Sequence, residues 1–316
     1  MPTRQATTEA TYRIRNWKQD NDALVRRGSL TLGVDQDTLR AWRYQGPARR
    51  GAQCEDRDRA IECLLTLRCV SHLTRRATAG CARSLVGLLG VDLSVPDSSP
   101  LGRRAATVRI TLPKQAEGPL HLVRDRTGLK VDGAGQWKVR QHGSSQRRTG
   151  LKLHRAVAPQ THEIRAAMVT DPGVTDAETV PALLEQVADP VERAAGDGAY
   201  DRPEVSDALE SRSARAVIPP RRDAQLKRHG TTSGPRLARD ETLRRIRQIG
   251  RKGWKAASGD HARSRAETAM VRMKTIFGDG VASRGPAPQA TAAGLRGRAL
   301  NVMTHQGMPR SERIAA

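Results

Sequence analysis

Three acidic residues occupy positions from which they could hold metal ions. Asp125 lies at the end of the predicted strand that begins at Leu120, and Asp197 directly follows another short strand. Glu267 lies within a predicted helix. Phosphoryl transfer by two metal ions needs hard oxygen ligands that hold the ions about 3.5–4 Å apart. Carboxylates from two strand ends and one crossing helix can supply that geometry. Because the chain has 33 acidic residues, only these positions give the triple any weight.

Each carboxylate also has a simpler interpretation. Asp125 could be a solvated strand end, and Asp197 could cap the segment that follows it. Glu267 could pair with Arg263 on its own helix. Two basic residues favour the catalytic interpretation, since Arg263 precedes Glu267 by four positions and Lys274 follows it by seven. At these offsets a helix places all three within about 40° of one another, so the cations could meet DNA phosphates beside a metal site.

The residues around the three carboxylates resemble the catalytic blocks of DDE transposases from bacterial insertion sequences, of the insertion-sequence family five type. The resemblance runs from about Tyr12 to Met308, and the three blocks occur in the family's order. The blocks are Leu120–Val131 around Asp125, Gly196-Asp197-Gly198-Ala199-Tyr200-Asp201, and the Arg263/Glu267/Lys274 set.

The resemblance implies an RNase H-like catalytic domain in which Asp125, Asp197 and Glu267 hold two Mg²⁺ (or Mn²⁺) ions. The implied reaction is hydrolytic nicking at the ends of the element, followed by strand transfer into target DNA without a covalent intermediate. The implied partners are double-stranded DNA, as terminal inverted repeats and as target, and a second copy of the chain. No nucleotide cofactor is expected. Lys130, in the first block, is expected to contact DNA beside Arg263 and Lys274.

Five positions depart from the family's pattern. The family has an aliphatic residue at Arg124, an apolar one at Arg155, and serine at Arg126. Because side chains alternate along a strand, Arg124 should lie beside Leu122 on the face opposite Asp125, and an unpaired guanidinium buried there costs several kcal/mol. The other two departures are Asp260 in place of a tyrosine and Gly150 in place of an aromatic residue. Together the five raise the alternative of a decayed copy that binds DNA without cleaving it.

The elements that would position these residues follow an α/β order. Strands are predicted at 120–123, 137–140, 153–157 and 164–169, then before Asp197 and at 216–218. Helices are predicted after a Thr175/Glu178 capping box, within 203–209, and near 240–253, 260–277 and 292–303. This order predicts one mixed sheet flanked by helices.

Three short helices precede the sheet, between Ala60 and about Arg109. Apolar residues recur at helical spacing in the first two, Gly90 follows the second, and Ser99-Pro100 starts the third. Arg103 and Arg104 on the third helix favour a helix-turn-helix-like DNA-binding domain. A plain helical bundle fits the same pattern. The predicted division is a basic arm at 1–58 with a helix at 16–27, the helical domain at 59–112, the RNase H-like domain at 113–308 and a tail at 309–316.

Charge points to the same partner as the motifs. The chain carries a formal net charge of +22, so release of counterions makes nucleic acid its natural ligand. Only 3% of residues are aromatic, which argues against folds that stack bases on aromatic side chains. With no apolar leader at its start and no apolar run of spanning length, the chain is expected to be cytoplasmic and nucleoid-associated, without a membrane partner. The four cysteines lack metal-site spacing and are expected to be reduced thiols.

Three other classes of protein are alternatives to an active transposase. A transposase-derived DNA-binding protein would keep the charge and the helices but would not need the carboxylates. A different nuclease could use the same fold, because fold alone does not decide function. An arginine-rich RNA-associated protein would explain the charge but would leave three ordered blocks to coincidence.

Overall fold

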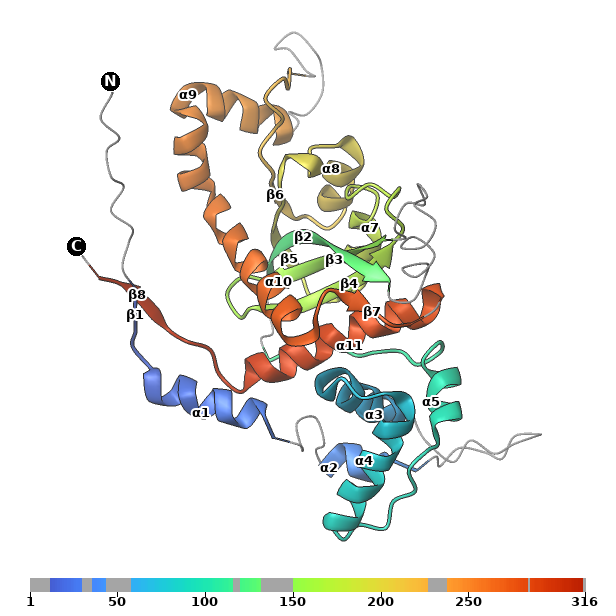
Figure 1. Cartoon of the computed structure of the whole chain (residues 1–316). Helices are drawn as coiled ribbons and strands as arrows, with labels where there is room; N and C mark the ends of the chain where they lie inside the picture. Colours follow the sequence, from blue (N-terminus) through green and yellow to red (C-terminus); the bar gives the residue numbers. More distant parts are fainter. Residues whose placement is uncertain are drawn as a thin grey trace, which may run out of the picture.

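A six-stranded mixed sheet forms the centre of the molecule (Figure 1). The computed structural model describes residues 12–29, 36–43, 58–115, 120–131, 150–226, 238–283 and 285–314. The strand order is β4-β3-β2-β5-β6, and β7 pairs with the far end of β2. The strands are β2 (Leu120–Val131), β3 (Gly150–Ala158), β4 (Glu163–Thr170), β5 (Val191–Ala195), β6 (Arg215–Val217) and β7 (Gly280–Val281). The first three are antiparallel, and β5 and β6 run parallel to β2, as expected for an RNase H-like fold.

Helices cover both faces of the sheet, and the alternating apolar residues of the strands pack against them. Leu122 packs with α7 (Val180–Glu185) and α8 (Pro203–Glu210) on one face. Its neighbour Val123 packs on the opposite face, because successive side chains alternate. That second face is covered by α9 (Ala238–Ser258), α10 (Ser264–Phe277) and α11 (Pro286–His305). The predicted fold class, a mixed α/β sheet flanked by helices, is therefore confirmed.

Most predicted elements are present, with shifted bounds. The helix predicted over 260–277 is a 3₁₀ turn, η2 (Asp260–Arg263), followed by α10, and α9 is kinked at Gly250. Ahead of α7, the Thr175 hydroxyl donates to the Glu178 carboxylate at 2.6 Å, and the helix begins only at Val180. The strand predicted at 137–140 lies outside the described residues.

The three predicted N-terminal helices are α3 (Asp58–Ser71), α4 (Arg75–Leu88) and α5 (Ser98–Arg104). The cap of α5 is Asp97 rather than Ser99, so Pro100 lies inside the first turn. Their apolar residues form a core of their own that also contains Leu295 of α11. α11 therefore joins two cores, with the sheet on one side and α3 on the other (Figure 1).

Segments from the two ends of the chain lie side by side. β1 (Tyr12–Ile14) pairs with β8 (Ser311–Arg313), and α1 (Trp17–Arg27) follows β1. In α1, the Arg27 Nε donates to the Met303 carbonyl at 3.0 Å, which ties this helix to the end of α11. A short helix, α2 (Gln36–Arg40), precedes α3. The predicted arm and the predicted tail thus meet in a small two-stranded sheet away from the main one (Figure 1).

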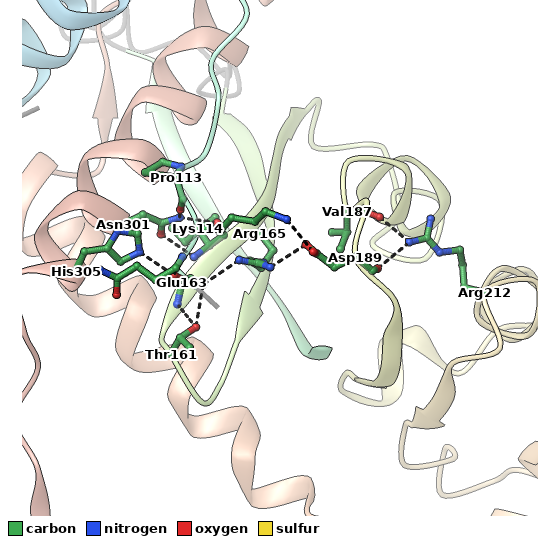
Figure 2. A network of polar contacts seen from close by, with 12 residues as sticks. Pro113, Lys114, Thr161, Glu163, Arg165, Val187, Asp189, Arg212, Asn301 and His305 are labelled. Carbon is green, nitrogen blue, oxygen red and sulfur yellow. Dashed lines mark hydrogen bonds and ion pairs between the residues drawn. The ribbon is translucent and has the colours of Figure 1, made fainter. Parts of the chain in front are cut away.

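A polar network fastens the connection between the helical region and the sheet (Figure 2). Glu163, at the start of β4, is 1% exposed and accepts from the Gln115 main-chain N–H at 2.8 Å. It also bonds Arg165 and His305, at 2.9 and 2.7 Å. Arg165 reaches onward to Asp189, ahead of β5, at 2.8 Å. One buried carboxylate thereby links the connecting segment, the sheet and α11.

Membrane spanning finds no support among the described helices. None of them combines the length and the apolar character needed to cross a bilayer.

Candidate active site

The main chain brings positions 125 and 197 to the same level of the sheet. The parallel pairing of β2 with β5 ends at Val123 opposite Ala195, and each acidic residue comes two positions later. The prediction that Asp125 ends its strand is wrong, because β2 continues to Val131 through its pairing with β3. In that pairing, position 125 is opposite Arg155. The side chain of Asp125 lies outside the described part of the structure.

Asp197 and Glu267 line one pocket, together with Arg263. Asp197 follows β5, and its Oδ1 accepts from the Ala199 N–H at 2.8 Å, which starts the 3₁₀ turn η1 (Gly198–Tyr200). It therefore both caps this turn and faces the pocket. Glu267 comes from the first turn of α10, on the helical side of the sheet. The structure thus joins two of the three predicted catalytic residues with one predicted DNA contact.

Arg124 is buried, as the alternation of β2 predicted. It is 3% exposed on the Leu122 face, and none of its guanidinium nitrogens has a hydrogen-bond partner among the described residues. The guanidinium carbon lies 5.0 Å from the centre of the Tyr200 ring, a cation–π contact. Burial lowers the pKa of Arg124 to about 10. Gly196 permits this arrangement, because a Cβ there would lie 2.8 Å from the Tyr200 ring.

The prediction missed a further carboxylate, Asp176, which also lines the pocket. Asp176 is 7% exposed, and its Oδ2 lies 2.8 Å from the Arg126 Nε. Burial raises the pKa of Asp176, and the nearby Asp197 acts in the same direction, against Arg126 and Lys152. In the sequence Asp176 stands between the Thr175/Glu178 pair, where it has the appearance of an ordinary helix-start residue. Nothing local marks it as part of the site.

The remaining predicted DNA contacts lie outside the pocket. Lys130 is exposed and pairs with Asp279 at 2.6 Å, and Lys274 is exposed near the end of α10. In α5, Arg103 is exposed, whereas Arg104 forms an ion pair with Asp58. Lys130 thus lies near the far end of β2 and Lys274 near the end of α10, and the other two lie on α5.

The other unusual positions are mostly buried. Arg155 is fully buried between Leu153 and Val157. Asp260 is 5% exposed, and its Oδ1 has no hydrogen-bond partner among the described residues. Gly150 is half-buried at the start of β3.

His154 is fully buried and bonds Thr170 at 2.8 Å, and burial lowers its pKa to about 4. Cys63, Cys69 and Cys81 form no disulfide in the described part of the chain, and Cys54 lies outside it.

The donor chemistry of the pocket suits a hard divalent cation, with one opposing feature. Asp197 and Glu267 offer carboxylate oxygens, the ligands that Mg²⁺ and Mn²⁺ prefer. Over the described residues alone, no three acidic, histidine or cysteine side chains gather into a metal-binding group. The side chain of Asp125, the third predicted ligand, lies outside the described residues. The opposing feature is that Arg124, Arg126 and Arg263 line the same pocket.

The strand order β4-β3-β2-β5-β6 is that of an RNase H-like fold, and a pocket that contains carboxylates lies beyond β5. The chain belongs to the family of transposase DDE domains: a family model with that description matches residues 116–302, more than half of the chain. A second model, also described as a transposase DDE domain, matches residues 25–134. This membership makes the chain a transposase by descent, in a class of nucleic-acid-processing enzymes that use divalent metal ions.

Two solved structures align with most of the chain at low similarity. The piggyBac transposase synaptic complex with hairpin DNA aligns at 11% identity and a TM-score of 0.38, covering 94% of this chain and 78% of the other. A chain of the simian T-cell lymphotropic virus intasome in complex with PP2A regulatory subunit B56 gamma aligns at 15% identity and a TM-score of 0.27. That alignment covers 71% of this chain and 69% of the other. The family assignment rests on the family models.

Proposed function

We propose that this chain is the transposase of a bacterial insertion sequence, which cleaves DNA at the ends of its element and joins them to target DNA. The observation that carries the proposal is the shared pocket of Asp197, Glu267 and Arg263, with position 125 level with Asp197 on the neighbouring strand. Asp197 and Glu267 lie 70 positions apart in the sequence and still line one pocket. This convergence of carboxylates with an arginine supports a phosphoryl-transfer site.

In this proposal Asp125, Asp197 and Glu267 hold the divalent ions, Mg²⁺ or Mn²⁺. When bound, the ions would supply an activated water or 3′-hydroxyl and would stabilise the leaving oxygen. Asp197 is held for this role by its bond to the Ala199 N–H, which fixes the carboxylate at the end of β5. Arg263 is placed to bind the phosphate on which the reaction takes place, because it lines the pocket beside Glu267.

Exposed cations on β2 and α10, two elements that also supply the candidate site, support binding of double-stranded DNA. Lys130 and Lys274 would contact phosphates next to the cleaved strand. The helical region at 59–112, with Arg103 on its third helix, would recognise the terminal inverted repeats. Holding two element ends together requires at least two copies of the chain, so the working form would be a homodimer on DNA.

End cleavage tests this function. Purified protein is incubated with labelled duplex that carries the terminal repeats flanking its own gene, in Mg²⁺, in Mn²⁺ and in EDTA. We expect metal-dependent nicks at the repeat ends, which Asp125→Ala and Glu267→Gln both abolish. Because Glu267 is exposed, the Gln variant should fold normally and should still bind the duplex. Nicks that persist in both variants would show that the pocket is not the catalytic site.

A second candidate is a DNA-binding protein derived from a transposase that has lost catalysis. It is favoured by the buried Arg124 and by the ion pair between Arg126 and Asp176, which place unusual positive charge in the pocket. This candidate predicts binding to the same duplex with no cleavage in either metal. Folded protein that binds and never cuts would establish it.

A further inference from the structure

Positive and negative charges balance in the pocket, and this balance has a consequence for metal binding. Three of its lining side chains are arginines, namely Arg124, Arg126 and Arg263. Three are carboxylates, namely Asp176, Asp197 and Glu267, and Tyr200 completes the lining. The residues available to hold two divalent ions therefore start from a neutral environment.

One of the carboxylates is already committed to an arginine. The Arg126 Nε lies 2.8 Å from Asp176 Oδ2, and the Asp176 side chain is 7% exposed. Lys152 Nζ and His154 Nδ1 each lie 3.9 Å from the other oxygen, Oδ1. Asp176 thus serves as an anchor that holds the Arg126 guanidinium in the pocket. Half of the Arg126 side chain remains exposed, so it can also reach a ligand that enters from solvent.

A neutral pocket binds Mg²⁺ or Mn²⁺ poorly by itself. Mg²⁺ gives up its water reluctantly, so its affinity depends on the negative charge of its ligands. Each arginine at close range removes part of that attraction, since Coulomb energy scales with the product of the charges. DNA changes the balance, because every phosphate brings one negative charge and the guanidinium groups of Arg126 and Arg263 match its geometry.

We propose that the pocket binds divalent cations only together with DNA, and that Arg126, anchored by Asp176, is the residue that enforces this order. A DNA phosphate offsets the positive charge of Arg126 and Arg263, so that the carboxylates of Asp197 and Glu267 attract the ions more strongly. The free protein then carries no loaded metal site until DNA has entered the pocket. This inference rests on the proposed function, since it assumes that DNA enters this pocket.

Thermodynamic linkage gives the inference a second readout. If DNA raises the affinity for the metal ion by some factor, the metal ion must raise the affinity for DNA by the same factor. Neutralising Arg126 by mutation should therefore do two things at once. It should strengthen metal binding by the free protein, and it should weaken the coupling between metal and DNA.

Mn²⁺ binding followed by electron paramagnetic resonance tests the inference on the full chain. Free Mn²⁺ is titrated against protein alone, and against protein with a duplex of about 30 base pairs, long enough for the multiple phosphate contacts expected here. Binding by the duplex alone is subtracted. For the wild type, we expect the duplex to tighten Mn²⁺ binding at least ~10-fold, the scale of an ordinary coupling between sites. For Arg126→Gln we expect binding at least ~10-fold tighter without DNA, and a coupling reduced to about 2-fold or less.

Two matched variants separate this effect from a structural one. Arg126→Lys keeps the charge next to Asp176, and Mn²⁺ binding by the free protein should stay as weak as in the wild type. Arg215→Gln removes an equal charge from an exposed position on β6, outside the pocket, and should leave Mn²⁺ binding unchanged. The circular dichroism of Arg126→Gln should match that of the wild type, since Arg126 is half-exposed and its loss leaves the sheet intact.

The possible outcomes distinguish this inference from the proposed function. Tight Mn²⁺ binding by the free wild-type protein, or no gain in Arg126→Gln, overturns the inference even if the chain cleaves DNA at its repeats. Absence of DNA binding and of cleavage overturns the proposed function, and the inference with it. Metal binding that appears with duplex in the wild type, and without duplex in Arg126→Gln, supports both.

Discussion

Replacing the buried arginine of β2 with methionine should make the protein more stable. Arg124 is 3% exposed, and none of its nitrogens has a hydrogen-bond partner among the described residues. Among the described residues, its guanidinium contacts the Tyr200 ring, at 5.0 Å. In Arg124→Met a flexible apolar side chain of similar length can keep the contact with the ring through its sulfur. The charge is lost, and little packing is lost with it.

The size of the effect follows from the proton equilibrium. Burial lowers the pKa of Arg124 from 12.5 to about 10. At 1.36 kcal/mol per unit, the folded environment disfavours the charged form by about 3 kcal/mol. We expect the free energy of unfolding of Arg124→Met to exceed that of the wild type by about 2–3 kcal/mol, within the range for replaced buried charges. The difference should shrink above pH 10, where the folded wild type begins to lose the proton that its unfolded state still holds.

Urea denaturation followed by circular dichroism measures the difference. Arg215→Met, at an exposed position on β6, is the control and should change the free energy by less than about 0.5 kcal/mol. An Arg124→Met protein that is less stable than the wild type by more than this control would refute the reasoning. The buried guanidinium would then be a net stabilising group.

Three further changes test other parts of the fold. Burial lowers the pKa of His154 to about 4. As the pH falls from 6.5 to 4, this histidine therefore gains a proton in the unfolded chain but stays neutral in the folded protein. Stability should therefore fall by up to about 3 kcal/mol over that interval, with a shallower pH dependence in His154→Gln. Gly250→Ala should lower the free energy of unfolding by about 1–3 kcal/mol, measured by thermal unfolding, because the kink requires a φ of 73° and a ψ of 161°. The control, Gly253→Ala at a helical position, should be close to neutral. Asn301→Ala should lower the free energy of unfolding in urea by about 2–4 kcal/mol, because the buried Asn301 side chain bonds both the N–H and the carbonyl of Ile164 in β4. A loss below about 1 kcal/mol would count against that role.

The elements around the main sheet were predictable because their signals are local. Alternating apolar residues gave the strands, and this alternation also placed Arg124 beside Leu122 on a buried face. The blocks around Asp197 and Glu267 identified two carboxylates that the fold brings into one pocket. Position 125 was assigned to the correct strand but to its end, because nothing within that segment shows that pairing with β3 continues to Lys130.

The parts that escaped prediction depend on contacts across the chain. Asp176 enters the pocket only through the packing of the turn before α7, and its partner Arg126 lies 50 positions away. The pairing of β1 with β8 joins two three-residue strands, each too short to carry a pattern of its own. The capping of η1 by Asp197 was foreseen as an alternative to a role in the site. The structure combines the two roles in one side chain.

The meeting of the chain's two ends has a consequence for biosynthesis. The hydrogen bond from Arg27 to Met303 joins residues 276 positions apart, and the pairing of β1 with β8 joins residues that are farther apart still. At a translation rate of about 5–20 residues per second, α1 spends roughly 15–60 s outside the ribosome before its partner has been made. Throughout this time the side chains of Trp17 and Val25, which are 64% and 71% exposed even in the finished fold, have no neighbours from the C-terminal segment. The contact between α1 and the C-terminal segment can therefore form only after synthesis of the chain is almost finished.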